Sequence, residues 1–145
     1  MVNEPKTILL VEDNPDDVEL TRRALLRSNV ANRLDVVTDG VAALDYLFAE
    51  GEHAGRAGGL PEVVLLDLKL PKLGGIDVLR RLRADERTRL LPVVILTSSD
   101  EEQDVMDSYE LGANSYVRKP VDFEQFVEAV RILGLYWLVL NIKAP

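Results

Sequence analysis

The stretch Val63-Val64-Leu65-Leu66-Asp67 decides the fold. Four consecutive apolar residues run directly into a carboxylate, with Pro61 before the run and Pro71 shortly after it. A short apolar run between such boundaries is typical of a strand buried on both faces in the middle of a parallel sheet. Asp67 would then lie at the carboxyl end of the strand, where open α/β sheets bind ligands. Asp67 could equally start a turn or cap the next helix, since aspartate favours both positions.

Four further apolar runs of strand length accompany this one along the chain, and helical patterns separate them. The expected strands are Thr7–Val11, Leu34–Thr38, Leu91–Thr97 and Ser115–Arg118. The expected helices run from about Pro15 to Ser28, after Gly40, after Gly75, after Asp100 and from Asp122 onward. Such alternation predicts a single doubly wound α/β domain over residues 1–145, with five parallel strands and helices on both faces.

Composition excludes several classes of function. The 145 residues include 25 acidic and 17 basic side chains, for a net charge of −8, which argues against nonspecific binding to nucleic acid or to an anionic membrane. There is no cysteine, so thiol catalysis, disulfides and cysteine metal sites are excluded. The N-terminus is polar, and no apolar run reaches the roughly 18 residues that span a bilayer. We therefore expect a cytoplasmic protein with no membrane or nucleic-acid partner.

The segment after the first strand is acidic and lacks glycine. A nucleotide-binding loop would need glycines there, so that backbone N–H groups could approach a phosphate. Glu12, Asp13, Asp16 and Asp17 offer carboxylates instead, which are the ligands that Mg²⁺ prefers. Helix capping and attraction to the positive helix end account well for Asp16 and Asp17. They account less well for Glu12 and Asp13, which directly follow a buried strand.

Polar side chains follow four of the five expected strands, and parallel strands end at the same edge of a sheet. That edge would carry Glu12, Asp13, Asp67, Thr97 and Lys119. Three crowded carboxylates repel one another, and a divalent cation relieves the repulsion. A carboxylate nucleophile, a metal, a lysine and a hydroxyl are the groups needed for phosphoryl transfer to an aspartate.

An ordered set of motifs resembles the receiver domain of bacterial two-component response regulators over residues 6–133. The motifs are Glu12-Asp13, Asp67 after its strand, Thr97-Ser98 and Lys119-Pro120. The resemblance implies a flavodoxin-like (βα)5 fold with sheet order 2-1-3-4-5. It also implies that Asp67 accepts a phosphoryl group from a phosphohistidine on a sensor histidine kinase.

The same resemblance assigns roles to the neighbouring residues. Mg²⁺ would be held by Glu12, Asp13, Asp67 and the backbone carbonyl of Lys69. Lys119 would contact the phosphoryl group and Thr97 would swing toward it, while Tyr116 would turn inward behind Thr97. Taken alone, Tyr116 is an ordinary half-buried strand residue.

No output domain follows the receiver pattern, so we expect a stand-alone regulator that docks to a partner or passes the phosphoryl group on. Three segments resemble single-domain regulators paired with phytochrome-type histidine kinases: Glu50–Leu60, Asp85–Arg87 and Tyr136–Leu138. The expected sensor is therefore a phytochrome-type kinase. The sequence does not identify the downstream target.

The C-terminal tail, residues 134–145, is more apolar than one amphipathic helix can bury. Large apolar patches seldom stay exposed, so we expect a homodimer through the last helix and the tail. Folding of the tail back onto its own domain is the alternative. The expected interface residues are Phe126, Leu133, Tyr136, Trp137 and Leu138.

Three other classes of function compete with this interpretation. A phosphatase of the haloacid dehalogenase type usually carries a second aspartate two positions after its nucleophile, and Lys69 stands there instead. A receiver-like docking module that works without phosphorylation would lack one of the acids, the threonine or the lysine, and none is missing. A phosphorylation-independent docking module and a phosphorelay intermediate are kept as the alternatives.

Overall fold

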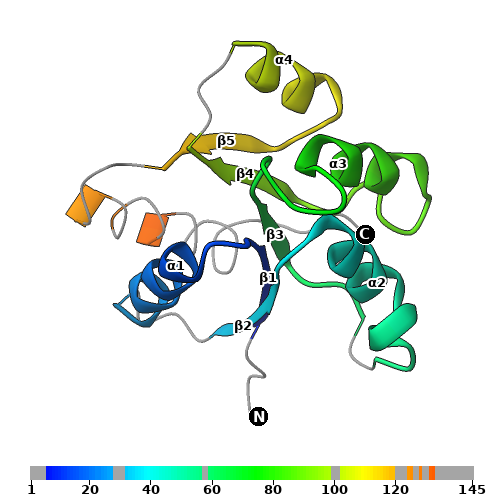
Figure 1. Ribbon diagram of the computed structural model, residues 1–145, viewed down its shortest axis with the longest axis horizontal. Helices are drawn as coiled ribbons and strands as arrows, with labels where there is room; N and C mark the ends of the chain where they lie inside the picture. Colours follow the sequence, from blue (N-terminus) through cyan, green and yellow to red (C-terminus); the bar gives the residue numbers. More distant parts are fainter. Residues whose placement is uncertain are drawn as a thin grey trace.

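The computed structural model describes residues 6–27, 32–56, 59–98, 102–119, 124–125, 128 and 131–132. Within these residues, five parallel strands alternate with helices (Figure 1). The strands are β1 (Lys6–Val11), β2 (Asn32–Val37), β3 (Val63–Leu66), β4 (Val93–Thr97) and β5 (Ser115–Arg118). The helices are α1 (Pro15–Arg27), α2 (Gly40–Phe48), the 3-10 turn η1 (Gly51–His53), α3 (Gly75–Ala84) and α4 (Glu102–Glu110).

The sheet has the order β2-β1-β3-β4-β5, which confirms the predicted doubly wound topology. β3 lies at the centre and pairs with β1 on one side and β4 on the other. All four of its residues are buried, as the uninterrupted apolar run predicted. Strand order reverses between β1 and β3, which is the place where such sheets bind ligands.

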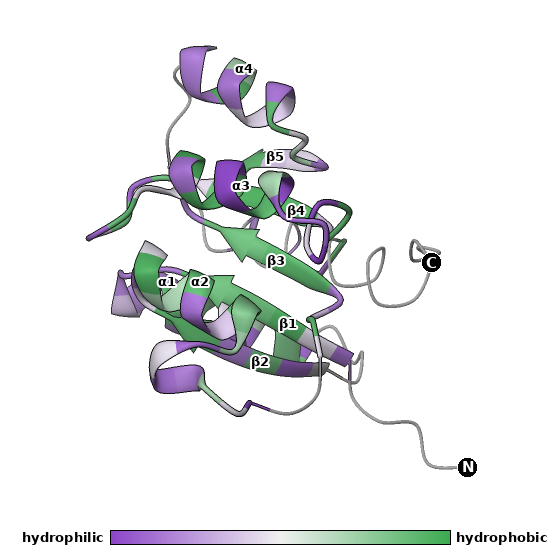
Figure 2. Ribbon diagram, turned by 90° about the vertical axis from the view of Figure 1, so that its right-hand side faces the viewer, coloured by the Kyte–Doolittle hydropathy of each residue, from purple (hydrophilic) through white to green (hydrophobic). Residues whose placement is uncertain are grey.

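Alternate residues along the strands supply two separate cores. Figure 2 shows the hydrophobic colouring along β1 and β3. On one face, Leu9 and Leu66 pack with apolar residues of α2 and α3. On the other face, Leu10 and Leu65 pack with Leu25 of α1. Full burial of one such side chain contributes about 1.5–3 kcal/mol relative to exposure. The apolar runs are continuous because both faces of the sheet are covered.

Part of the connection after α2 is anchored to that helix. Arg56 donates a hydrogen bond from Nε to the Tyr46 carbonyl at 2.9 Å. Its guanidinium also lies 4.1 Å from the centre of the Tyr46 ring, a favourable cation–π position. His53 meets the same ring edge-on at 5.3 Å. These contacts fix η1 against α2.

The predicted dimer interface lies outside the described residues. This applies to Phe126, Leu133, Tyr136, Trp137 and Leu138, so the interface stays a prediction. One described residue of this C-terminal region, Glu124, lies near α1, where its Oε2 is 3.6 Å from Arg27 Nη1. Among the helices that the structure describes, none is long and apolar enough to cross a membrane.

Candidate functional site

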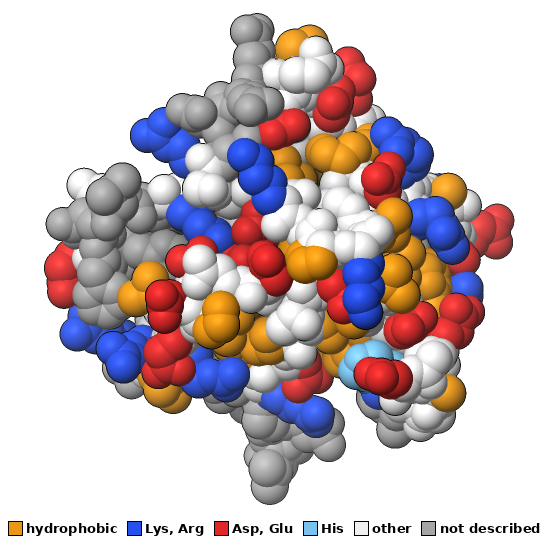
Figure 3. Space-filling view, in the orientation of Figure 1, with side chains coloured by type: hydrophobic (Ala, Val, Ile, Leu, Met, Phe, Trp, Pro, Cys, Tyr) orange, Lys and Arg blue, Asp and Glu red, His pale blue; other side chains and the backbone are white. Residues whose placement is uncertain are grey.

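The strand-end residues are positioned by hydrogen bonds that continue the sheet past the strands. The backbone N–H of each donates to a carbonyl of the neighbouring strand: Asp67 to Val11 (3.1 Å), Glu12 to Val37 (3.0 Å) and Lys119 to Thr97 (2.7 Å). Because the sheet fixes these backbones, the side chains converge at one edge. Acidic side chains gather near the centre of the molecular face that Figure 3 shows.

Asp67 is buried, with 7% of its surface exposed, and both of its carboxylate oxygens have partners. Thr97 Oγ1 donates to Oδ1 at 2.6 Å, and the Lys69 backbone N–H donates to the same oxygen at 3.2 Å. Lys119 Nζ donates to Oδ2 at 3.1 Å. The structure therefore brings Asp67, Thr97 and Lys119 together, as the strand ends predicted.

These partners keep the Asp67 carboxyl ionised. Burial alone would raise its pKa, but the hydrogen bond from Thr97 and the charge of Lys119 outweigh burial and lower the pKa below its usual value. An ionised carboxylate is the nucleophilic form.

Glu12, Asp13 and Asp67 form the candidate metal site. Each offers a carboxylate oxygen, and these oxygens lie within 4.8 Å of one another. Glu12 and Asp67 are buried, whereas Asp13 is exposed. Burial, together with the nearby Asp67 charge, raises the pKa of Glu12 to about 7, although Lys119 opposes this rise. A cluster of hard oxygen ligands on a partly open edge fits a divalent cation such as Mg²⁺.

Lys119 contacts three carboxylates at once. It donates to Glu12 Oε1, to Asp17 Oδ2 at 2.8 Å and to Asp67 at 3.1 Å. Burial opposes its charge, but the hydrogen bonds to Asp17 and Glu12 raise its pKa above the usual value. Its side chain is only 10% exposed, so these interactions are weakly screened by solvent.

Sequence reasoning missed the role of Asp17, which it explained by the attraction of an acidic side chain to the positive end of the helix. Capping belongs to Asn14, whose Oδ1 accepts the backbone N–H of Asp16 at 2.9 Å. Asp17 instead projects from the first turn of α1 onto Lys119. The available signal was its position, since a helix that follows a strand directly begins at the same edge as the strand end.

Thr97 and Tyr116 lie on neighbouring strands, as the switch hypothesis requires. Thr97 is fully buried, and Tyr116 is half-buried against the core beneath α2 and α3. In the sheet register, Tyr116 pairs with Ile95, two residues before Thr97. The structure does not test the movement of either side chain.

A buried strand-end aspartate, bonded to a threonine and a lysine beside an acidic cluster in a 2-1-3-4-5 sheet, defines the receiver class of doubly wound domains. The chain belongs to the response regulator receiver domain family, whose model matches residues 8–131.

Three solved structures of response regulators are similar along almost the whole chain. The phosphorylated cyanobacterial phytochrome response regulator RcpA is 37% identical, with 97% of this chain and 99% of RcpA covered and a TM-score of 0.90. The Mn²⁺-bound form of Rcp1, a protein of Synechocystis, is 35% identical, with 97% and 100% covered and a TM-score of 0.89. The bacteriophytochrome response regulator RtBRR is 55% identical, with 97% and 85% covered and a TM-score of 0.78.

Proposed function

We propose that Asp67 accepts a phosphoryl group from a sensor histidine kinase, with Mg²⁺ bound at the same edge of the sheet. The observation that carries this proposal is the placement of one ionised, buried carboxylate between Thr97 and Lys119, within 4.8 Å of two further carboxylates. Glu12, Asp13, Asp67 and the backbone carbonyl of Lys69 would hold the metal. Bound Mg²⁺ would supply positive charge against the oxygens of the transferring phosphoryl group.

In the proposed reaction, an oxygen of Asp67 attacks the phosphorus of the phosphohistidine. An O–P bond forms, the P–N bond breaks, and the imidazole nitrogen keeps the electron pair. Lys119 then donates to a phosphoryl oxygen in place of the carboxylate oxygen it holds at 3.1 Å. Its charge offsets the negative charge that builds up during transfer.

The proposed switch follows from the hydrogen bond of Thr97. Its hydroxyl donates to Asp67 Oδ1 before the reaction, and a phosphoryl group on Asp67 offers stronger oxygen acceptors farther out. Thr97 moves toward them, and Tyr116 turns into the space behind it. The change alters the surface around β5 and α4, which we propose as the docking face for a downstream partner.

The proposed kinase is of the phytochrome type, supported by the similarity to RcpA, a phytochrome response regulator, and to RtBRR, a bacteriophytochrome response regulator. We propose that the chain is one receiver domain over residues 1–145 that acts in the cytoplasm as a phosphoacceptor, not as a turnover enzyme. Lys69 stands where a phosphatase would carry its second acid. A docking module independent of phosphorylation and a phosphorelay intermediate are the alternatives.

Phosphotransfer from purified kinases tests the proposal. A phytochrome-type kinase and an unrelated histidine kinase are each loaded with radiolabelled phosphate and mixed with the wild-type protein or with Asp67→Asn. We expect rapid transfer from the phytochrome-type kinase to wild type only. Equal transfer from both kinases would refute the pairing, and labelling of Asp67→Asn would refute the acceptor.

We also propose a homodimer through the last helix and the tail, because the tail is too apolar to stay exposed. Light scattering of the wild type and of Leu138→Glu tests this directly. The wild type is expected at twice the monomer mass and the variant at the monomer mass. A monomeric wild type would support a tail folded back onto its own domain.

A further inference from the structure

The N-terminus of α2 touches the loop that follows the phosphoacceptor strand, backbone against backbone. Gly40 is buried there, and its N–H donates to the Pro71 carbonyl at 3.3 Å. A Cβ atom on Gly40 would lie 2.0 Å from the carbonyl oxygen of Leu73. Contacts this short do not occur, so no other residue fits unless the loop moves.

The loop at this contact is tightly turned. Lys72 adopts a φ of 66°, in the left-handed region that non-glycine residues rarely enter. The Leu73 N–H donates to the Pro71 carbonyl at 2.7 Å, which closes the turn around Lys72. Such a conformation persists only where the surrounding structure holds it.

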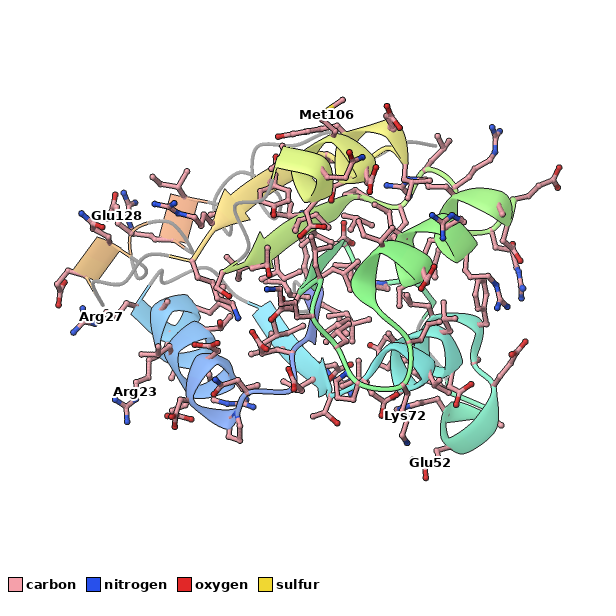
Figure 4. All side chains as sticks on the ribbon, turned by 45° about the horizontal axis from the view of Figure 1, so that its top comes forward. Arg23, Arg27, Glu52, Lys72, Met106 and Glu128 are labelled. Atoms are coloured by element: carbon pink, nitrogen blue, oxygen red, sulfur yellow. The ribbon has the colours of Figure 1, made fainter. Side chains whose placement is uncertain are left out.

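A second contact from α2 holds the same turn. Asp39 caps α2 by accepting the Ala42 N–H at 2.7 Å, and its other oxygen lies 3.6 Å from Lys72 Nζ. Figure 4 shows Lys72 on this loop, next to α2. The Lys72 side chain is largely exposed, so the ion pair contributes little by itself. The close contact at Gly40 is therefore the main restraint.

The turn is only two residues from the peptide expected to bind the metal. The Lys69 N–H already donates to Asp67 Oδ1 at 3.2 Å. At the far end of the loop, the Gly75 N–H donates to the Leu68 carbonyl at 2.9 Å. Only Lys69 and Leu70 lie between the anchored Leu68 and the turn, so a displacement of the turn must be taken up there and reorients the Lys69 peptide.

We propose that Gly40 is a positioning residue for the metal site. Its lack of a side chain lets α2 pack closely on the loop and so hold the Lys69 peptide where its carbonyl could bind the ion. The inference rests on the proposed function, since it concerns the Mg²⁺ site described above. It adds a residue that touches neither the metal nor the phosphoryl group.

Gly40→Ala tests the inference, with Gly74→Ala as the matched control. A Cβ on Gly74 would meet its nearest atom, the Leu68 carbonyl oxygen, at an ordinary 3.7 Å, and its φ of −68° suits alanine. Thermal unfolding of each protein is followed in EDTA and across a Mg²⁺ titration, because a ligand that binds only the folded state raises the midpoint. The titration gives an apparent Mg²⁺ affinity separately from the metal-free stability.

We expect Gly40→Ala to weaken Mg²⁺ binding about tenfold, as loss of a supporting residue around a metal site commonly does. Gly74→Ala should keep the wild-type affinity. An equal loss of midpoint in EDTA and in Mg²⁺ would overturn the inference, because Gly40 would then support only the fold. A wild type without any Mg²⁺ response would refute the proposed metal site, and the positioning role with it.

Asp39→Ala gives an independent test if Gly40→Ala does not fold. It removes the cap that holds the first turn of α2, and with it the support of Gly40 against the loop, and it adds no atoms to the contact. We expect a weaker Mg²⁺ affinity than in wild type, with a smaller loss than in Gly40→Ala. Unchanged affinity in a folded Asp39→Ala protein would contradict the inference.

Discussion

Replacing Lys119 with methionine should turn the site into an uncompensated cluster of carboxylates. Methionine keeps most of the side-chain volume, so the change removes a charge without leaving a large cavity. Lys119 lies 2.8 Å from Asp17 and 3.1 Å from Asp67, and it also bonds Glu12. At an effective dielectric constant of about 20, each such pair has a gross attraction of roughly 5 kcal/mol.

The net loss is smaller, because burying a lysine is itself unfavourable and a carboxyl can take up a proton. Removing one partner of a buried ion pair commonly costs 3–5 kcal/mol. We expect Lys119→Met to lower the free energy of unfolding by about 3 kcal/mol at pH 8 without metal. At pH 6 the loss should shrink, because Glu12, whose pKa is already about 7, becomes protonated and no longer repels Asp67.

Urea unfolding at pH 6 and pH 8, with and without Mg²⁺, measures both effects. Mg²⁺ should recover more stability in Lys119→Met than in wild type, because the cation replaces the missing charge. Arg23 is exposed and pairs with Glu19 instead of the site, so it gives the control variant Arg23→Met, whose loss of stability relative to wild type should not depend on pH or Mg²⁺. A loss in Lys119→Met that is the same at both pH values and unaffected by Mg²⁺ would refute the reasoning.

Three further predictions concern individual contacts. Thr97→Val removes a 2.6 Å hydrogen bond to the buried Asp67 carboxylate. The free energy of unfolding, measured by denaturation, should fall by about 2 kcal/mol, and the Asp67 pKa, measured by NMR titration, should rise. Without metal, the raised Glu12 pKa means that the folded state binds more protons than the unfolded state between pH 4.5 and about 7. Stability should therefore fall by about 3 kcal/mol as pH rises through that window, and Glu12→Gln should abolish this slope in unfolding measurements. Gly75→Ala would place a Cβ 2.3 Å from the Asp67 carbonyl oxygen and should cost about 2 kcal/mol or more by urea unfolding, whereas Gly74→Ala should cost under about 1 kcal/mol.

The sequence predicted the architecture well because its signals were redundant. Val63–Leu66 is apolar at every position, and burial on both faces of a central parallel strand is the arrangement that such a run favours. Once the strands were placed, a parallel sheet required Asp67, Thr97 and Lys119 to share an edge. Their hydrogen bonds confirm that inference.

Other features were beyond sequence reasoning because one residue type serves several purposes. Asp17 is an acidic residue in the first turn of a helix, where attraction to the positive helix end is a sufficient explanation. Only the path of α1 places its carboxylate 2.8 Å from Lys119 Nζ. Gly40 follows an aspartate before a helix, a pattern that a simple turn would also produce. The close approach of Leu73 to Gly40 joins segments more than thirty residues apart, so the residues around Gly40 in the sequence do not predict it.

The measurement that tests the central claim most directly is the mass of the intact protein after incubation with acetyl phosphate. Wild type and Asp67→Asn are each treated with and without Mg²⁺, beside a receiver domain known to react. The account predicts one added phosphoryl group on wild type, absent in Asp67→Asn and absent without Mg²⁺. No added group on wild type, under conditions that label the control receiver, would contradict it and favour a docking module that works without phosphorylation.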